Sequence, residues 1–171
     1  MVCSRFDQES NEQLLSWCDV IVIGPGLGTS VASREREQWF LTAAAREKKP
    51  LILDADGLNL LAAHPQWYQY LGEHVVLTPH IGEMSRLSGR TIQEIQHEIA
   101  DTALKCAAET GSVCVLKDAC TVIADEKGQM YLNLSGNSGM ATAGSGDVLS
   151  GILAAVLCMY LKTEEQPPMV L

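Results

Sequence analysis

The sequence predicts an α/β fold with a mainly parallel sheet, helices on both faces of that sheet, and an antiparallel hairpin attached to it. Three observations support this fold class. Short apolar runs alternate with segments of helical periodicity along most of the chain. The apolar runs are continuous, which is typical of parallel strands buried on both faces. Four of them end in polar or glycine-rich residues, and ligands in such sheets bind beyond the carboxyl ends of the strands.

Four parallel strands are expected before the hairpin. They lie at residues 19–23, 51–53, 75–77 and 113–116. The pattern then changes, because two short runs at 121–124 and 129–132 flank the turn sequence Asp125-Glu126-Lys127-Gly128. Two runs joined by a short polar turn that contains glycine predict a β-hairpin.

The helices between the strands have recognisable boundaries. Residues 31–48 form the first predicted helix, and residues 58–63 form a short one that Pro65 stops. The next long helix opens with the capping-box pattern Thr91-Ile92-Gln93-Glu94 and ends at Gly111. Helices between consecutive strands are the crossovers that parallel pairing requires.

The last apolar run, at residues 148–161, follows a loop rich in glycine, serine and asparagine. It contains Ser150 and Gly151 and is shorter than the ~20 residues that a membrane-spanning helix needs. We therefore predict a buried core helix and no membrane segment. Residues 1–10 lack the basic start and apolar run of a signal peptide.

Length and composition predict a single domain at residues 1–171. Of the 171 residues, 47% are hydrophobic, and a domain of this size buries roughly 70% of its unfolded surface. The net charge of -9, with no basic run, argues against nucleic-acid binding, because phosphate contacts need clustered lysine and arginine. The six cysteines form no CxxC pair and the four histidines show no zinc spacing, which predicts a reduced, cytoplasmic protein without a metal motif.

The first strand leads into the glycine loop Gly24-Pro25-Gly26-Leu27-Gly28. It is neither a dinucleotide fingerprint, because Thr29 stands where the third glycine should be, nor a Walker loop. Two interpretations stay open. The loop is a tight strand-to-helix turn, or its glycines let the backbone approach a ligand closely.

Polar residues follow the next three strands. Asp54 ends the second strand, His80 follows the third and Lys117 ends the fourth. Since the carboxyl ends of parallel strands share one edge of the sheet, these side chains are expected in one cleft. Asp56 has a simpler interpretation, because an aspartate before a helix commonly caps it.

The most informative segment runs from Gly136 to Asp147 and leads directly into the last helix. Three consecutive free amides near Gly144 to Asp147 would point outward at the helix N-terminus, and with the helix dipole they make an anion site suited to phosphate. Asp147 in the first turn could act as a general base. The alternative is a capping aspartate behind a flexible loop, which leaves the surrounding glycines unexplained.

Together these segments resemble successive motifs of the ADP- or ATP-dependent NAD(P)H-hydrate dehydratases, which are ribokinase-like α/β proteins. The resemblance is carried by residues 22–28, 53–59, 77–80, 115–117 and 136–151, in the family order. It implies a lyase that restores NADH or NADPH from the hydrated dinucleotide. The nucleotide consumed is ADP in most bacterial members and ATP in eukaryotic ones, with Mg²⁺ on its phosphates.

The resemblance also implies roles for individual residues. Those implied to contact the hydrated dinucleotide are Gly26, Gly28, Asp54 and His80, with Asp147 at its hydroxyl. Those implied to bind the nucleotide are Lys117, Asp118, Ala119, Cys120 and Thr121, with Gly144, Ser145 and Gly146 at its phosphates. The implied chemistry activates the hydroxyl by phosphoryl transfer and then eliminates phosphate.

The chain departs from the family pattern in three ways. Ile81 replaces the usual proline, and Asp118 replaces the usual glycine, where a carboxylate aimed at phosphates would repel them. Relatives also carry further strands and helices before the first strand and more helix after the last one. We therefore expect an incomplete version of the family domain, which is either a homo-oligomer through its open sheet edge or poorly stable, and weakly active at best.

Two other functions stay open. A ribokinase-like kinase for a vitamin precursor or sugar would use the same base and anion site but stop after phosphoryl transfer. A non-catalytic nucleotide-binding remnant is compatible with the shortened chain and with Asp118, although the presence of Asp147 counts against it.

Overall fold

The structure is a computed structural model that describes residues 8–136, 139 and 142–161. A six-stranded sheet runs through it in the order β1-β2-β3-β4-β5-β6. The strands are β1 (Ile21–Ile23), β2 (Leu51–Leu53), β3 (Val75–Leu77), β4 (Val113–Leu116), β5 (Thr121–Ala124) and β6 (Met130–Asn133). Pairing is parallel from β1 to β4 and antiparallel from β4 to β6, so the predicted parallel sheet with a hairpin is confirmed.

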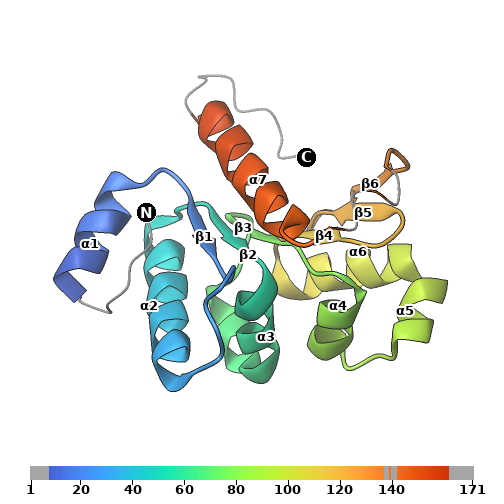
Figure 1. Ribbon diagram of the computed structural model, residues 1–171, viewed down its shortest axis with the longest axis horizontal. Coiled ribbons are helices and arrows are strands. Elements are labelled where there is room, and N and C mark those ends of the chain that lie inside the picture. The colour runs from blue at the N-terminus through green and yellow to red at the C-terminus, as the bar shows by residue number, and fades with distance from the viewer. Residues whose placement is uncertain (1–7, 137–138, 140–141, 162–171) are drawn as a thin grey trace.

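Helices lie on both faces of the sheet, but unequally (Figure 1). They are α1 (Gln8–Trp17), α2 (Val31–Glu47), α3 (Ala55–Ala63), the 3-10 segment η1 (Pro65–Tyr70), α4 (Ile81–Ser88), α5 (Ile92–His97), α6 (Ile99–Thr110) and α7 (Ser145–Leu161). Strands β1 to β4 neighbour one another in chain order, and right-handed crossovers that all step in one direction place their helices on one face. Helices α2 to α6 therefore share a face, and α7 covers the other.

The helices predicted from the sequence are wrong in part. The long helix expected from Thr91 to Gly111 is two helices, because Glu98 leaves the helical conformation with φ -128° and ψ 44°. Its capping box is confirmed, since Thr91 Oγ1 accepts from the Glu94 amide and the Glu94 carboxylate accepts from the Thr91 amide. Helices α1 and α4 and the segment η1 were not predicted.

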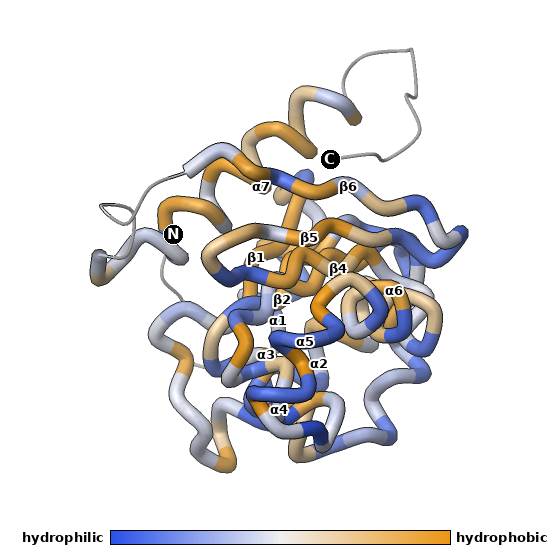
Figure 2. Tube along the Cα trace, turned by 90° about the vertical axis from the view of Figure 1, so that its right-hand side faces the viewer, coloured by the Kyte–Doolittle hydropathy of each residue, from blue (hydrophilic) through white to orange (hydrophobic). Residues whose placement is uncertain are grey.

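The strand side chains alternate between two apolar layers. Leu51, Leu53 and Leu77 face α2 to α6, where two large clusters are buried. Ile52 and Val76 face the other way, in a smaller cluster that α7 completes. In Figure 2 the apolar strands are orange segments of the tube in the middle of the molecule.

The last helix, α7, is not the buried core helix that the sequence predicts, because it is apolar on its outer side as well as its inner side. Only Ser150 and Leu157 are buried among its residues, whereas Val148, Ile152 and Met159 are each more than half exposed. None of the described helices combines the length and the apolar character needed to cross a membrane.

Candidate functional site

Three polar side chains from distant parts of the chain meet at the carboxyl edge of the sheet. Asp54 follows β2 and is only 2% exposed. Its Oδ1 lies 2.9 Å from Lys117 Nζ, and its Oδ2 accepts a hydrogen bond of 2.7 Å from Ser150 Oγ. Lys117 follows β4 and Ser150 lies in α7, so one carboxylate joins two strand ends and a helix.

The ionised form of Asp54 is stabilised by these partners. Burial acts to raise the pKa of Asp54, because it removes the charged carboxylate from water. The hydrogen bonds from Ser150 and Lys117, together with the Lys117 charge, outweigh burial and bring the pKa below its ordinary value. The edge of the sheet therefore carries a buried Asp54–Lys117 ion pair.

The first turn of α7 rests directly on this ion pair. A Cβ atom at Gly146 would lie 3.7 Å from Asp54 Oδ2 and 3.9 Å from Lys117 Nζ. Asp147 is the next residue and is exposed. The sequence-based expectation that Asp54, Lys117 and the start of the last helix lie together is met.

Fewer backbone amides are free at the start of α7 than the three consecutive ones that the sequence predicts. The Ser145 amide donates to Thr142 O at 3.2 Å, and the first helical bond runs from the Val148 amide to Gly144 O at 3.1 Å. Among the described residues, the amides of Gly146 and Asp147 have no backbone partner and are available to an anion in this first turn. Residues 137, 138, 140 and 141 of the predicted motif lie outside the described residues.

His80 lies beside Lys117, at the end of β3. The two residues form an isolated parallel bridge, and the Lys117 amide donates to Pro79 O at 2.8 Å. His80 and the start of α7 therefore both border Lys117, on one edge of the sheet. Among the described residues, no hydrogen bond or ion pair joins His80 or Gly26 to Asp147.

His80 is also the N-cap of α4. Its Nδ1 accepts from the amides of Gly82 at 2.9 Å and Glu83 at 3.2 Å, while Glu83 Oε2 accepts from the His80 amide at 2.8 Å. Burial raises the pKa of Glu83, and the hydrogen bond from His80 partly opposes this. A histidine in a capping box is unusual, since serine and threonine are the common caps. Because the cap is a histidine, the sequence pattern did not predict α4.

In the glycine loop after β1 the structure supports the interpretation as a tight turn, and the approach of a ligand stays a prediction. Gly24 has φ 126°, and a Cβ atom there would lie 1.7 Å from Asp54 O, so β1 can approach α3 only through glycine. Gly26 and Gly28 are exposed, also with positive φ. The Gly28 amide donates to Asp56 Oδ2 at 2.9 Å. The first glycine is thus required by packing, and the other two are accessible.

The simpler interpretation of Asp56 as the cap of α3 is wrong. The N-cap position belongs to Asp54, and Asp56 lies inside the first turn of the helix. Its carboxylate holds the glycine loop through the Gly28 amide instead. The helix starts three residues earlier than predicted, so Asp56 lies in its first turn, and its side chain reaches the loop after β1.

The segment that follows Lys117 connects β4 to the hairpin. Asp118 and Ala119 are exposed, and Thr121 begins β5. Cys120 Sγ donates to Asn133 O at 3.3 Å. The segment therefore borders the Asp54–Lys117 pair through Lys117, while the Asp118 carboxylate lies in solvent.

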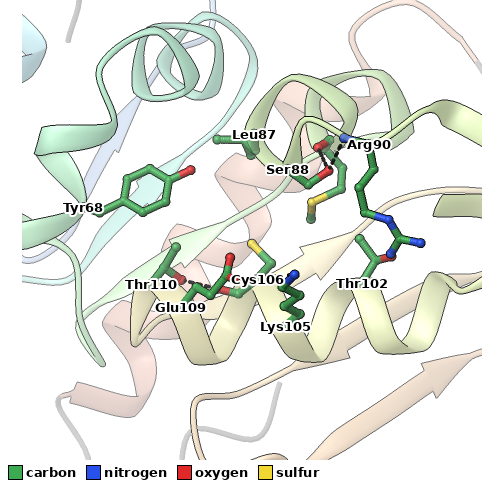
Figure 3. A pocket seen from close by; sticks show the side chains of 10 residues that line it. Tyr68, Leu87, Ser88, Arg90, Thr102, Lys105, Cys106, Glu109 and Thr110 are labelled. Atoms are coloured by element: carbon green, nitrogen blue, oxygen red, sulfur yellow. Dashed lines mark hydrogen bonds and ion pairs between the residues drawn. The ribbon is translucent and has the colours of Figure 1, made fainter. Parts of the chain in front are cut away.

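A separate cavity of about 120 Å³ lies between η1, α4 and α6, on the face of the sheet that carries α2 to α6 (Figure 3). Its walls include Tyr68, Leu87, Arg90 and Cys106. The Arg90 guanidinium is already paired there, with Nη1 donating to Thr102 Oγ1 at 2.9 Å. None of the predicted site residues lines this cavity, so it is distinct from the carboxyl edge of the sheet.

Comparison with known proteins shows to which family the chain belongs. The family model described as NAD(P)H-hydrate dehydratase matches residues 1–167. The chain belongs to the NAD(P)H-hydrate dehydratase family. A bifunctional NAD(P)H-hydrate repair enzyme of Thermofilum pendens is 45% identical to it over 147 residues, which are 86% of this chain and 28% of that protein.

Two solved structures show the same fold. The ADP/ATP-dependent NAD(P)H-hydrate dehydratase from Bacillus subtilis, co-crystallised with ATP/Mg²⁺ and soaked with CoA, has a TM-score of 0.67 at 34% identity. A ribokinase-like superfamily protein from Enterococcus faecalis has a TM-score of 0.74 at 33% identity. They cover 82% and 87% of this chain, which spans 48% and 51% of theirs. The ribokinase-like fold is confirmed, in a chain that spans about half the length of these family structures.

Proposed function

We propose that this chain carries the nucleotide-binding and catalytic edge of a lyase that dehydrates hydrated NADH or NADPH, with ADP or ATP as the phosphoryl donor. The observation that carries the proposal is the contact of the first turn of α7 with the Asp54–Lys117 pair. Gly146 borders the lysine at the strand ends, and Asp147 follows Gly146 in the chain. The similarity at 45% identity to a repair enzyme favours this activity over phosphorylation of a vitamin precursor or sugar.

In the proposed reaction Asp147 removes the proton from the substrate hydroxyl. The hydroxyl oxygen then attacks the terminal phosphorus of the nucleotide, and the bond to the leaving nucleotide breaks. The amides of Gly146 and Asp147 stabilise the charge on the transferring phosphoryl group. Loss of phosphate from the substrate carbon, with a proton from the neighbouring carbon, restores the dihydronicotinamide. Asp147 fits the role of a base because its carboxylate is exposed to an incoming substrate.

The substrate-binding roles of Gly26, Gly28 and His80 are part of the proposal. The two glycines are exposed after β1 and His80 follows β3, so all three border the same edge as α7. The nucleotide is proposed to lie along residues 117–121 and 144–146. The cytoplasmic location expected from the sequence stays a prediction.

The residues at this edge do not form a metal site by themselves. The described part of the chain holds no group of three His, Cys, Asp or Glu side chains able to bind a metal ion. Both Asp54 oxygens are occupied by Lys117 and Ser150. Mg²⁺ commonly binds substrate phosphates and keeps several waters. The proposal is therefore that Mg²⁺ enters with the nucleotide, and no step depends on a protein-bound ion.

Asp147→Asn tests the proposal. It keeps the size of the side chain but removes the base, so turnover of hydrated NADH should fall about 10²–10⁴-fold, while nucleotide affinity stays the same. Turnover is followed by the dihydronicotinamide absorbance with ADP or ATP present, and affinity by calorimetry. Near-normal turnover in the variant would reduce Asp147 to a helix residue without a catalytic role.

The same assay separates the alternatives in the unsubstituted chain. A kinase would accumulate a phosphorylated product without restoring the dihydronicotinamide. A nucleotide-binding remnant would bind ADP or ATP but show no turnover of hydrated NADH. Either result would overturn the proposed activity.

A further inference from the structure

Each oxygen of the Asp54 carboxylate has a hydrogen-bond partner within the protein. Asp54 is 2% exposed, and Lys117 and Ser150 each occupy one of its oxygens. These partners lie 63 and 96 residues away along the chain. A buried carboxylate that joins a strand end to a helix in this way holds both in place.

The first turn of α7 has few other attachments. Ser150 and Leu157 are its only buried residues in the part of the helix that the structure describes, and Leu157 lies two turns further on. Val148 and Ile152, on either side of Ser150, are exposed. The Ser150 hydroxyl is thus the buried polar contact nearest to Gly146 and Asp147.

We propose that Ser150 and Asp54 are positioning residues, which hold the first turn of α7 and the Lys117 ammonium in fixed relation to each other. This inference rests on the proposed function, because it concerns where the base and the phosphate-binding groups stand. Asp147 and the Gly146 amide lie on α7, and Lys117 lies on the end of β4. Phosphoryl transfer needs the groups on α7 and the Lys117 ammonium in the correct positions at the same time. A displacement of either by about 1 Å can lower the rate 10²-fold.

Asp54 also sets how strongly Lys117 attracts phosphate. At 2.9 Å the carboxylate balances much of the lysine charge, and the pair is screened little because it is mostly buried. Removing only the charge of Asp54 would leave Lys117 free to bind phosphate more tightly, in a position that no longer suits transfer. Positioning therefore predicts opposite changes in binding and in turnover.

The test compares Ser150→Ala with Ser88→Ala as a matched control. Ser150 Oγ lies 3.2 Å from Gly146 O as well as 2.7 Å from Asp54, and Ser88 Oγ donates to Met84 O at 2.7 Å. Both variants lose a bond to the preceding helical turn, but only Ser150→Ala loses the contact with Asp54. We expect kcat to fall about tenfold or more in Ser150→Ala, with the KM for nucleotide nearly unchanged, and no comparable loss in Ser88→Ala.

A second variant gives the opposite signature. Asp54→Asn keeps an oxygen for Ser150 but removes the charge next to Lys117. The dissociation constant for ADP or ATP should fall severalfold, because Lys117 is no longer neutralised, while kcat falls. A parallel loss of affinity and kcat in this variant would indicate a merely structural role and overturn the inference.

A third readout does not depend on turnover. The pKa of Asp54, followed by carbon NMR of its carboxyl group, should rise in Ser150→Ala and stay constant in Ser88→Ala. If the unsubstituted chain shows no turnover, the proposed activity fails, but the nucleotide affinities and this titration still decide the inference. An unchanged Asp54 pKa in Ser150→Ala would overturn it even in an active enzyme.

Discussion

The two faces of the sheet are closed to different extents. On the face that carries α2 to α6, Leu53, Leu77 and Leu116 are fully buried in two large clusters. On the opposite face a smaller cluster lies under α7 alone, and the outer surface of α7 exposes Val148 and Ile152. The crossovers between neighbouring strands close the first face by topology. The second face depends on one helix, and that helix also carries the start of the candidate site.

The largest effect is expected from a cavity on the closed face. Leu77→Ala should lower the free energy of unfolding by about 2–5 kcal/mol, because Leu77 is fully buried between the sheet and its helices. Ile152→Ala, on the outer surface of α7, should change it by less than about 0.5 kcal/mol. Denaturant unfolding of both variants measures the contrast. Equal losses would show that the outer surface of α7 is buried in solution.

The closed face also contains a buried carboxyl group with pH-dependent consequences. Glu37 in α2 is 0% exposed, and neither of its oxygens has a hydrogen-bond partner among the described residues. Burial, with a smaller contribution from Asp56, raises the pKa of Glu37 from 4.5 to about 8. A buried neutral acid is tolerated, whereas its ionised form is not.

This raised pKa predicts the direction of a stability change. Below pH 4.5 Glu37 is neutral in the folded and unfolded states, and between pH 4.5 and about 8 only the unfolded state loses the proton. The free energy of unfolding therefore falls as the pH rises through this range, by about 1.4 kcal/mol for each pH unit. Glu37→Gln stays neutral at every pH and should lack this contribution. Unfolding at several pH values would contradict the assignment if both proteins showed the same slope.

The smallest effect on stability is expected where the second face is open. The sequence predicts a homo-oligomer through an open sheet edge. The exposed apolar residues of α7 are a second surface, and on it we place a further contact. Ile152→Lys should weaken self-association in sedimentation experiments and change the free energy of unfolding by no more than about 0.5 kcal/mol. A stable monomer of the unsubstituted chain at high concentration would contradict this prediction.

Local pattern was enough for the strands and for some helix ends. Strands β2, β3 and β4 were predicted with the bounds that the structure shows, because continuous apolar runs between glycine, proline and polar residues have few other structures open to them. The capping box at Thr91 is equally local. Helix α4 was missed because its cap is His80, whose ring nitrogen replaces the usual hydroxyl.

The candidate site divides in the same way. By itself the sequence determined the order of the strands' polar ends, the glycine-rich start of the last helix and the family resemblance, since these depend on residues close together in the chain. Only the tertiary structure decided that Asp56 holds the glycine loop and that Ser150 reaches Asp54. Those contacts join residues 28 and 96 positions apart. Which partner a buried carboxylate finds depends on how whole elements pack, and no local periodicity records that choice.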